Sequence, residues 1–106
     1  MPQSNVVKNA EVGQVDLTAT ATVYEVCRLR GGESVTIKAL VANSGQAYIG
    51  FDKLLTTSNG FELEYGDSVS IELKKEFGAK NEVVIYACTN NAGDDVCFLK
   101  AMAVWP

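Results

Sequence analysis

Catalytic chemistry in this chain would have to come from carboxylates, because its 106 residues include no histidine. Histidine is the commonest general base and metal ligand, so Ser-His-Asp, Cys-His and His-based zinc sites cannot form within one chain. The three cysteines are too few for a four-ligand structural zinc site. Glu62 and Glu64 alternate with apolar residues, which predicts a solvated strand face rather than a pair of catalytic acids. We therefore expect no enzyme activity, no metal site and no cofactor.

An oxygen-rich segment runs from Asn90 to Asp95 and offers Asn and Asp side chains that calcium can bind. The segment lacks the spacing and the terminal glutamate of a calcium-binding loop. Asn, Asp and Gly are also the residues that a tight turn needs. The turn is the favoured interpretation.

Cys27, Cys88 and Cys97 all lie in apolar, strand-like stretches, where a cysteine usually acts as a small buried hydrophobic residue. If the last two strands form a hairpin centred on Ala92 and Gly93, Cys88 lies opposite Cys97, close enough for a disulfide. No secretory signal is visible at the N-terminus. Synthesis in a cytoplasm then favours free thiols over a disulfide.

The charge balance argues against nucleic-acid binding. Nine Lys and Arg residues stand against thirteen Asp and Glu residues, a net charge of −4. The longest basic run is Lys74-Lys75, whereas affinity for phosphate backbones depends on clustered cations. No apolar stretch approaches the ~20 residues of a membrane-spanning helix. We expect neither a nucleic-acid partner nor a membrane partner.

The elements that must position these side chains are short β-strands. Apolar and polar residues alternate from Val35 to Val41 and from Ser68 to Leu73, and the gaps between such runs carry Gly, Asn or Asp. No segment shows a helical period over the ~12 residues that a stable helix usually needs. The pattern predicts an all-β fold with seven to eight short strands. We expect an antiparallel β-sandwich, jelly-roll or Ig-like, or a small barrel.

The length and the 47% apolar content predict one folded domain with a single core, over residues 14–106. Residues 1–13 are polar, include Pro2 and Gly13, and show no clear period, so we expect an N-terminal arm. The arm is either a frayed terminus or a segment that becomes ordered against a neighbouring subunit.

The expected last hairpin is apolar on both faces, which exceeds what a two-layer sandwich in water requires. One face would carry Tyr86 and Leu99, and the other Phe98 and Met102. Either a loop or the N-terminal arm covers the second face, or that face packs on another subunit. Trp105 would then close the core or anchor such a contact.

Four strings of the sequence resemble a pattern that recurs in phage and virus particles. They are Asn43–Gly50, Asn59–Leu63, Gly66–Ile71 and Val84–Ala87. In that pattern an Asn-x-Gly turn precedes Tyr-Ile-Gly, and Gly-Phe-x-Leu precedes a Gly-acid-Ser corner. The pattern resembles small β-sandwich virion proteins, namely capsid decoration or cement proteins and head-fibre or tail accessory domains. The resemblance covers most of residues 33–104 and assigns no catalytic residue.

The resemblance implies a virion structural protein, made in the host cytoplasm and carried on the virion surface. Copies would associate as a symmetric homo-oligomer and bind the lattice of a major capsid protein, which would stabilise the head. We expect contacts from the arm, from the loop between Asp52 and Gly60, and from the last hairpin with the C-terminus. The interface residues are therefore expected to be Val6, Val7, Leu54, Leu55, Phe98, Met102 and Trp105.

An alternative function is a carbohydrate- or receptor-binding module of a tail, a fibre or a cell surface. Aromatic side chains offer flat apolar faces on which a sugar can stack. Tyr48, Tyr65 and Trp105 are the candidates in this chain. Ligand-specific binding of the isolated domain on a glycan array would favour this alternative.

Overall fold

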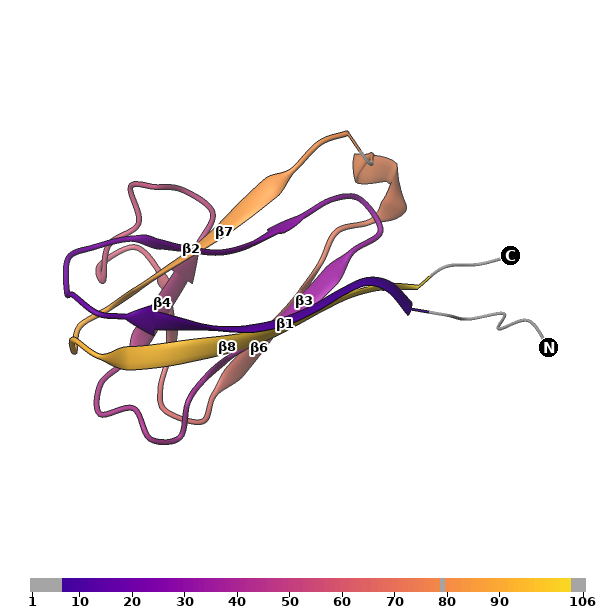
Figure 1. The fold of residues 1–106 in the computed structure, drawn as a ribbon. Coiled ribbons are helices and arrows are strands. Elements are labelled where there is room, and N and C mark those ends of the chain that lie inside the picture. Colours follow the sequence, from indigo (N-terminus) through magenta and orange to yellow (C-terminus); the bar gives the residue numbers. More distant parts are fainter. Residues whose placement is uncertain (1–6, 79, 104–106) are drawn as a thin grey trace.

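The computed structural model describes the backbone of residues 7–78 and 80–103 and the side chains of residues 11–78 and 80–101. The prediction of an all-β fold with seven to eight strands is confirmed, because eight strands account for nearly all of the regular structure of these described residues (Figure 1). No helix in this part of the chain has the length and apolar character needed to span a membrane. The elements are β1 (Val7–Leu17), β2 (Tyr24–Leu29), β3 (Ser34–Ala39), β4 (Ala47–Gly50), β5 (Phe61–Leu63), β6 (Ser68–Glu72), the 3-10 turn η1 (Lys75–Phe77), β7 (Val83–Thr89) and β8 (Asp94–Ala103).

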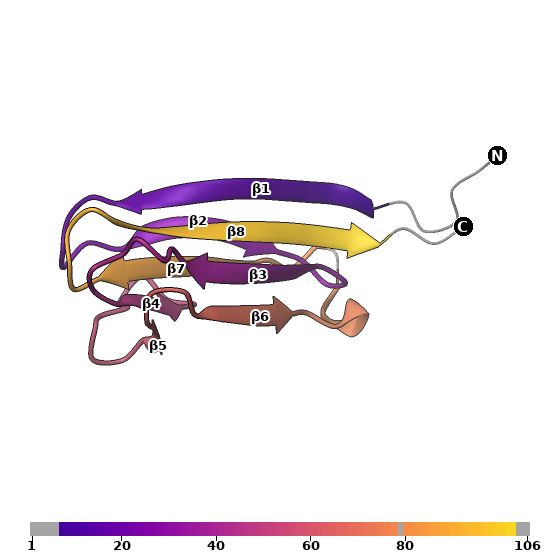
Figure 2. The same cartoon turned by 90° about the horizontal axis from the view of Figure 1, so that it is seen from below.

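The strands form two antiparallel sheets of four strands each. Sheet A has the order β1-β8-β3-β6, which Figure 2 shows from one edge to the other, and sheet B has the order β2-β7-β4-β5. At every step except β4 to β5, the chain crosses from one sheet to the other. This strand order is that of a jelly roll, one of the architectures that the sequence predicts.

The core lies between the two sheets and follows the alternation of the sequence. In β3, Val35, Ile37 and Ala39 are buried, whereas Thr36 and Lys38 face solvent. Two-residue periodicity of this kind places one face of each strand in the interior. Leucine, isoleucine and valine side chains from both sheets fill the layer, including Leu17, Leu29, Ile37, Ile85 and Val96.

The predicted pairing of the last two strands is wrong. β7 pairs with β2 and β4 in sheet B, and β8 pairs with β1 and β3 in sheet A. Cys88 therefore lies opposite Tyr48 and Cys97 lies opposite Lys38, and all three cysteines are free. The error has a physical cause. A short Gly-containing turn can connect two strands within one sheet or carry the chain between two packed sheets, and alternation within each strand looks the same in both cases.

The N-terminal segment also differs from the prediction. β1 begins at Val7 and pairs with β8 from Val7 opposite Ala103 to Leu17 opposite Asp94, so residues 7–13 belong to sheet A rather than to an arm. Only the β8 side of β1 is paired, because β1 is an edge strand. An edge strand with one solvated face tolerates polar residues and a β-bulge, which here lies between Lys8 and Glu11.

Candidate functional site

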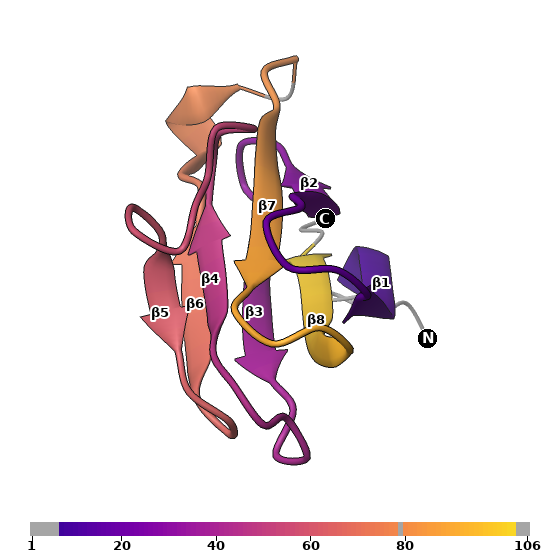
Figure 3. The same cartoon turned by 90° about the vertical axis from the view of Figure 1, so that its left-hand side faces the viewer.

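The two open edges of the sandwich carry different concave surfaces. β1 and β2 close the sheets at one edge, and β6 and β5 close them at the other (Figure 3). The first edge holds an open charged notch of about 570 Å³. The notch is lined by Glu11, Glu25, Val26, Cys27, Arg28, Arg30, Glu33, Glu82 and Lys100.

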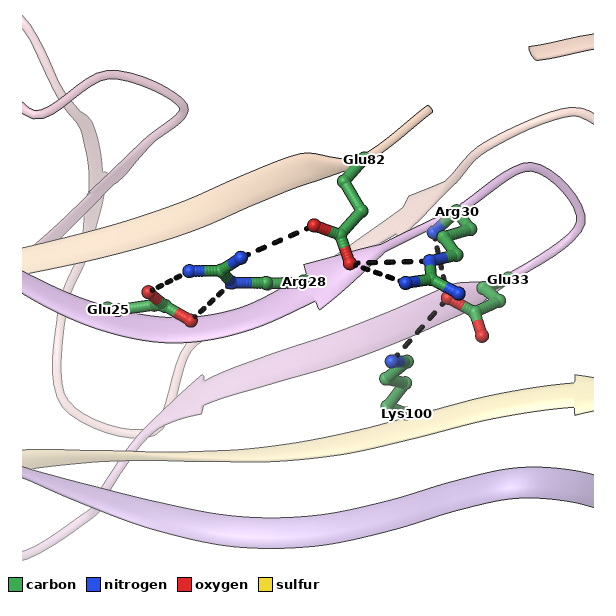
Figure 4. Close-up of polar contacts among 6 residues, drawn as sticks. All are labelled: Glu25, Arg28, Arg30, Glu33, Glu82 and Lys100. Carbon is green, nitrogen blue, oxygen red and sulfur yellow. Dashed lines mark hydrogen bonds and ion pairs between the residues drawn. The ribbon is translucent and has the colours of Figure 1, made fainter. Parts of the chain in front are cut away.

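A ladder of ion pairs runs along the rim of this charged notch (Figure 4). Arg28 Nε lies 2.9 Å from Glu25 Oε2, and Arg28 Nη1 lies 3.3 Å from Glu82 Oε1. Arg30 Nη2 lies 3.1 Å from Glu82 Oε2. Hydrogen bonds from Arg28 and from Arg30 hold the pKa of Glu25 and of Glu82, respectively, below the ordinary glutamate value. These groups are exposed, so the ladder contributes little to stability.

A β-bulge in β2 brings the ladder onto one face. Glu25 and Arg28 are three residues apart, a spacing that would normally place them on opposite faces of a strand. The register of β2 against β7 shifts between Glu25 and Cys27, so that Glu25 lies opposite Tyr86 and Arg28 lies opposite Val84. The extra residue puts both charged side chains on the outer face of sheet B.

Beneath the ladder lies a buried ion pair between Glu33 and Lys100. Their side chains are 5% and 15% exposed, and Lys100 Nζ lies 3.5 Å from Glu33 Oε1. The backbone N–H of Arg30 donates a hydrogen bond of 2.7 Å to the same oxygen. The cations of the notch thus already have carboxylate partners within the chain.

The one thiol of the charged notch is poorly suited to nucleophilic chemistry. Cys27 is buried, and that burial raises the pKa of its thiol to about 11. A cysteine nucleophile reacts as the thiolate and needs a lowered pKa. The charged side chains of the notch thus form a structural ion-pair network at the edge of the core.

The opposite edge presents an apolar surface, which we call the edge patch and define as Phe51, Leu54, Phe61, Val69 and Ile71. Phe51 and Phe61 are each 60% exposed and Leu54 is 78% exposed. An apolar hollow of about 170 Å³ lies beside Phe51 and Phe61, and its lining residues are Ile49, Gly50, Phe51, Phe61, Val69 and Ile71. A second hollow joins Phe51 to Leu54.

The edge patch arises because the sandwich is open on this side. β5 has three residues and ends sheet B, while β6 ends sheet A. Phe61 lies opposite Ile49, on the face that turns toward the interior, yet no strand covers it from outside. The apolar residues of two edge strands therefore meet solvent where the sheets part.

Among the predicted interface residues, only Leu54 has a described side chain that is exposed. Leu55 is 6% exposed and packs with Tyr48 and Cys88. Phe98 is 7% exposed and belongs to the core. The prediction is corrected for Leu55 and Phe98, because each fills space within its own chain.

Glycines create the space for both buried side chains. A Cβ at Gly50 or Gly60 would lie 2.8 or 2.7 Å from Leu55 Cδ1, and a Cβ at Gly13 would lie 2.6 Å from Phe98 Cε1.

The remaining interface predictions lie outside the described residues. Those residues are Val6 and Trp105 entirely, and Val7 and Met102 for their side chains.

Side chains of the oxygen-rich segment before β8 already form hydrogen bonds within the chain. Asp94 accepts hydrogen bonds from the N–H groups of Ser44 and Gly45, at 3.1 and 2.8 Å, and from Asn91 Nδ2 at 2.8 Å. The carboxylate therefore joins the β7–β8 turn to the β3–β4 loop. Within residues 11–78 and 80–101, no three acidic, cysteine or histidine side chains gather in a group that could hold a metal ion.

Sequence reasoning missed the edge patch. Phe51 and Phe61 flank the polar loop that is predicted to contact partners. Val69 and Ile71 belong to the alternating run from Ser68 to Leu73, a pattern that predicts one buried strand face. The missing information was that this face lies at an open edge.

Comparison of the chain with protein-family models, curated proteins and solved structures found no match.

Proposed function

We propose that this protein is a virion structural protein of the capsid decoration or cement type, which docks on a major capsid protein through its edge patch. The observation that carries the proposal is the exposure of Phe51, Leu54 and Phe61 beside an apolar hollow. Contiguous apolar surface on a small protein usually marks a site of association. The protein then acts by adhesion, on the surface of the virion and without catalysis.

Two further observations support this proposal. The jelly-roll order of the strands is an architecture used by viral capsid domains. The strings that resemble virion proteins also build the edge patch: Asn59–Leu63 contains β5, and Gly66–Ile71 contains the corner and most of β6. The resemblance and the exposed apolar surface therefore coincide in the same part of the fold.

Binding to the assembled lattice stabilises that lattice by mass action. Burial of one exposed Leu or Phe side chain contributes about 1.5–3 kcal/mol. Removal of one such contact should then weaken binding by roughly 10–100-fold. As the resemblance implies, copies also associate with one another as a symmetric homo-oligomer, which sedimentation of the protein alone would measure.

The experiment is co-sedimentation of the full chain with purified capsids that lack it. Leu54→Ser and Phe61→Ser should reduce capsid affinity roughly 10–100-fold without loss of fold. Leu99→Ser is the matched control, because Leu99 is 56% exposed on the outer face of sheet A, away from the edge patch. Parent-like occupancy by both patch variants would remove the edge patch from the mechanism. Failure of the parent chain to bind capsids would remove the virion role.

A carbohydrate- or receptor-binding module is the second candidate, since lectin domains also use the jelly roll. One observation favours it: Tyr65 is 60% exposed at the β5–β6 corner. Tyr48, in contrast, is 8% exposed beneath Leu55 and offers no free face. Specific signal on a glycan array that Tyr65→Ala abolishes would support the module over the capsid protein.

A further inference from the structure

Two aspartates face each other across the first strand pair of sheet A. Asp16 of β1 lies directly opposite Asp95 of β8. Side chains at directly opposed positions have their Cβ atoms about 4.5–5.5 Å apart, and like charges there destabilise a sheet. Lys38 faces the same side of the sheet, opposite Cys97, and forms no ion pair with either carboxylate. No ion pair among the described residues therefore offsets the repulsion between the two carboxylates.

The hydrogen bonds of Asp95 indicate how the repulsion between the two carboxylates can be reduced. Gln14 Nε2 donates a hydrogen bond of 2.9 Å to Asp95 Oδ2. Asp95 Oδ1 is buried and has no hydrogen-bond partner among the described residues. A buried acceptor without a donor is costly. The carboxyl group of Asp16, once protonated, can supply the missing donor.

The backbone of Asp95 is held in place while Asp16 lies on an edge strand. The N–H of Asp95 donates to Asn43 Oδ1 at 2.9 Å, and its carbonyl accepts from Asn43 Nδ2 at 2.8 Å. β1 is paired on one side only, and Asp16 is one residue from its end. If the two carboxylates repel, the end of β1 can move away from β8, whereas Asp95 stays in place.

We propose that Asp16 and Asp95 form a proton-operated latch at the C-terminal end of β1. In acid, one proton shared between the two carboxyl groups ties β1 to β8. When that proton is lost, two negative charges stand side by side and this end of β1 loosens. The inference is independent of the proposed function.

The other titratable groups near Asp16 and Asp95 do not replace either carboxyl group in the pair that shares a proton. Cys97 and Lys38 lie on the same outer face of sheet A, one step further along β8 and β3. Asp94 faces the opposite side and is bound by the β3–β4 loop. Reduced contact with water, together with the hydrogen bond and the negative charge of Asp95, raises the pKa of Asp16. A raised pKa means that the folded chain holds the proton more tightly than the unfolded chain, so the latch stabilises the fold in acid and loses this effect as pH rises.

The test compares the parent with Asp95→Asn and Asp16→Asn by thermal unfolding between pH 3 and pH 8. The side-chain amide that Asp95→Asn introduces can accept from Gln14 and donate to Asp16 at every pH, so it imitates the closed latch. Both variants should melt a few degrees above the parent at pH 7, and this advantage should vanish near pH 3. Hydrogen-exchange protection at Val15 to Leu17, relative to the core, should increase on acidification in the parent only.

Glu72→Gln is the matched control, because it removes one negative charge from the same face of sheet A, where Glu72 lies opposite Ser34. If Asp16→Asn and Asp95→Asn behave like Glu72→Gln at every pH, the latch is refuted. Millimolar calcium chloride at pH 7 is a further arm of the test. If calcium raises the melting temperature of the parent as acid does, and leaves Asp95→Asn unchanged, a cation rather than a proton closes the pair and the proposal is overturned.

Discussion

Asp94 and Asp95 are neighbours in β8, yet their carboxylates lie on opposite sides of sheet A in opposite electrostatic settings. Asp94 is 4% exposed and receives three hydrogen bonds from Ser44, Gly45 and Asn91. Asp95 lies opposite Asp16, a like charge. The lowered pKa of Asp94 and the raised pKa of Asp16, the residue opposite Asp95, therefore tie the stability of this protein to pH in opposite directions.

Asp94→Asn should destabilise the protein at neutral pH. Burial alone raises the pKa of Asp94, but the donors of Ser44, Asn91 and Gly45 outweigh it and hold the pKa below its ordinary value. A lowered pKa contributes stability above the unfolded-state value of about 3.9, and this contribution is lost as pH falls through the folded-state value. We expect a cost of about 1–3 kcal/mol at pH 7, measured by urea unfolding.

The cost of Asp94→Asn should shrink at pH 3, where the parent carboxylate itself takes up a proton. Asp67→Asn is the control, because the exposed carboxylate of Asp67 accepts one hydrogen bond, from the N–H of Glu64 at 3.1 Å. Equal effects of Asp94→Asn and Asp67→Asn at pH 7 would contradict the role of Asp94 as the joint between two loops.

Glu33→Gln should leave a buried cation without its partner. The amide oxygen that this substitution introduces can still accept from the N–H of Arg30, but Lys100, whose side chain is 15% exposed, loses its counter-charge. We expect a loss of about 1–3 kcal/mol in the free energy of unfolding, measured by chemical denaturation. Adding Lys100→Met to Glu33→Gln should recover part of the loss, since the double variant has no unpaired charge.

Glu25→Gln provides the comparison for Glu33→Gln, because Glu25 pairs with Arg28 on the exposed rim of the same charged notch. Exposed pairs contribute little. A cost at Glu33 no greater than the cost at Glu25 would show that the deeper pair is as solvated as the rim.

The three cysteines should differ in their reaction with iodoacetamide at pH 8. Burial raises the pKa of Cys27 to about 11 and also raises the pKa of Cys88, so both thiols stay protonated and shielded. Cys97 is half-buried on the outer face of sheet A. Mass spectrometry should find one fast adduct, on Cys97, and two further adducts after unfolding. Cys97→Ser should abolish the fast adduct, whereas a native Cys88–Cys97 disulfide would contradict the placement of β7 and β8 in different sheets.

Much of the local structure could be predicted from the residues themselves. Alternation marked β3 and β6 with their inward residues, and the Gly, Asn and Asp clusters marked the turns. The first part of β1 could not be predicted in this way, because residues 7–13 show no clear period and include the polar Lys8 and Glu11. Their strand conformation comes from hydrogen bonds to β8, more than 70 residues away in the chain.

The candidate site was predictable only in part. Leu54 and Leu55 are adjacent leucines in one loop, and the sequence treats them alike. In the fold, Leu54 is 78% exposed and Leu55 is 6% exposed, because the glycines at positions 50 and 60 leave room for one side chain. The burial of Phe98 could not be predicted from the sequence either, because it depends on the space above Gly13.

The sequence by itself determined which segments become strands, where the chain turns, and that no histidine is present for catalysis. Those properties are local, since they depend on two-residue periodicity and on backbone preferences at single positions. Only the tertiary structure decided that β7 and β8 lie in different sheets, that Asp16 meets Asp95, and that Phe61 lies at an open edge. These relationships follow from how two sheets close on a shared core, and sheet closure joins residues whose separation in the chain no local pattern encodes.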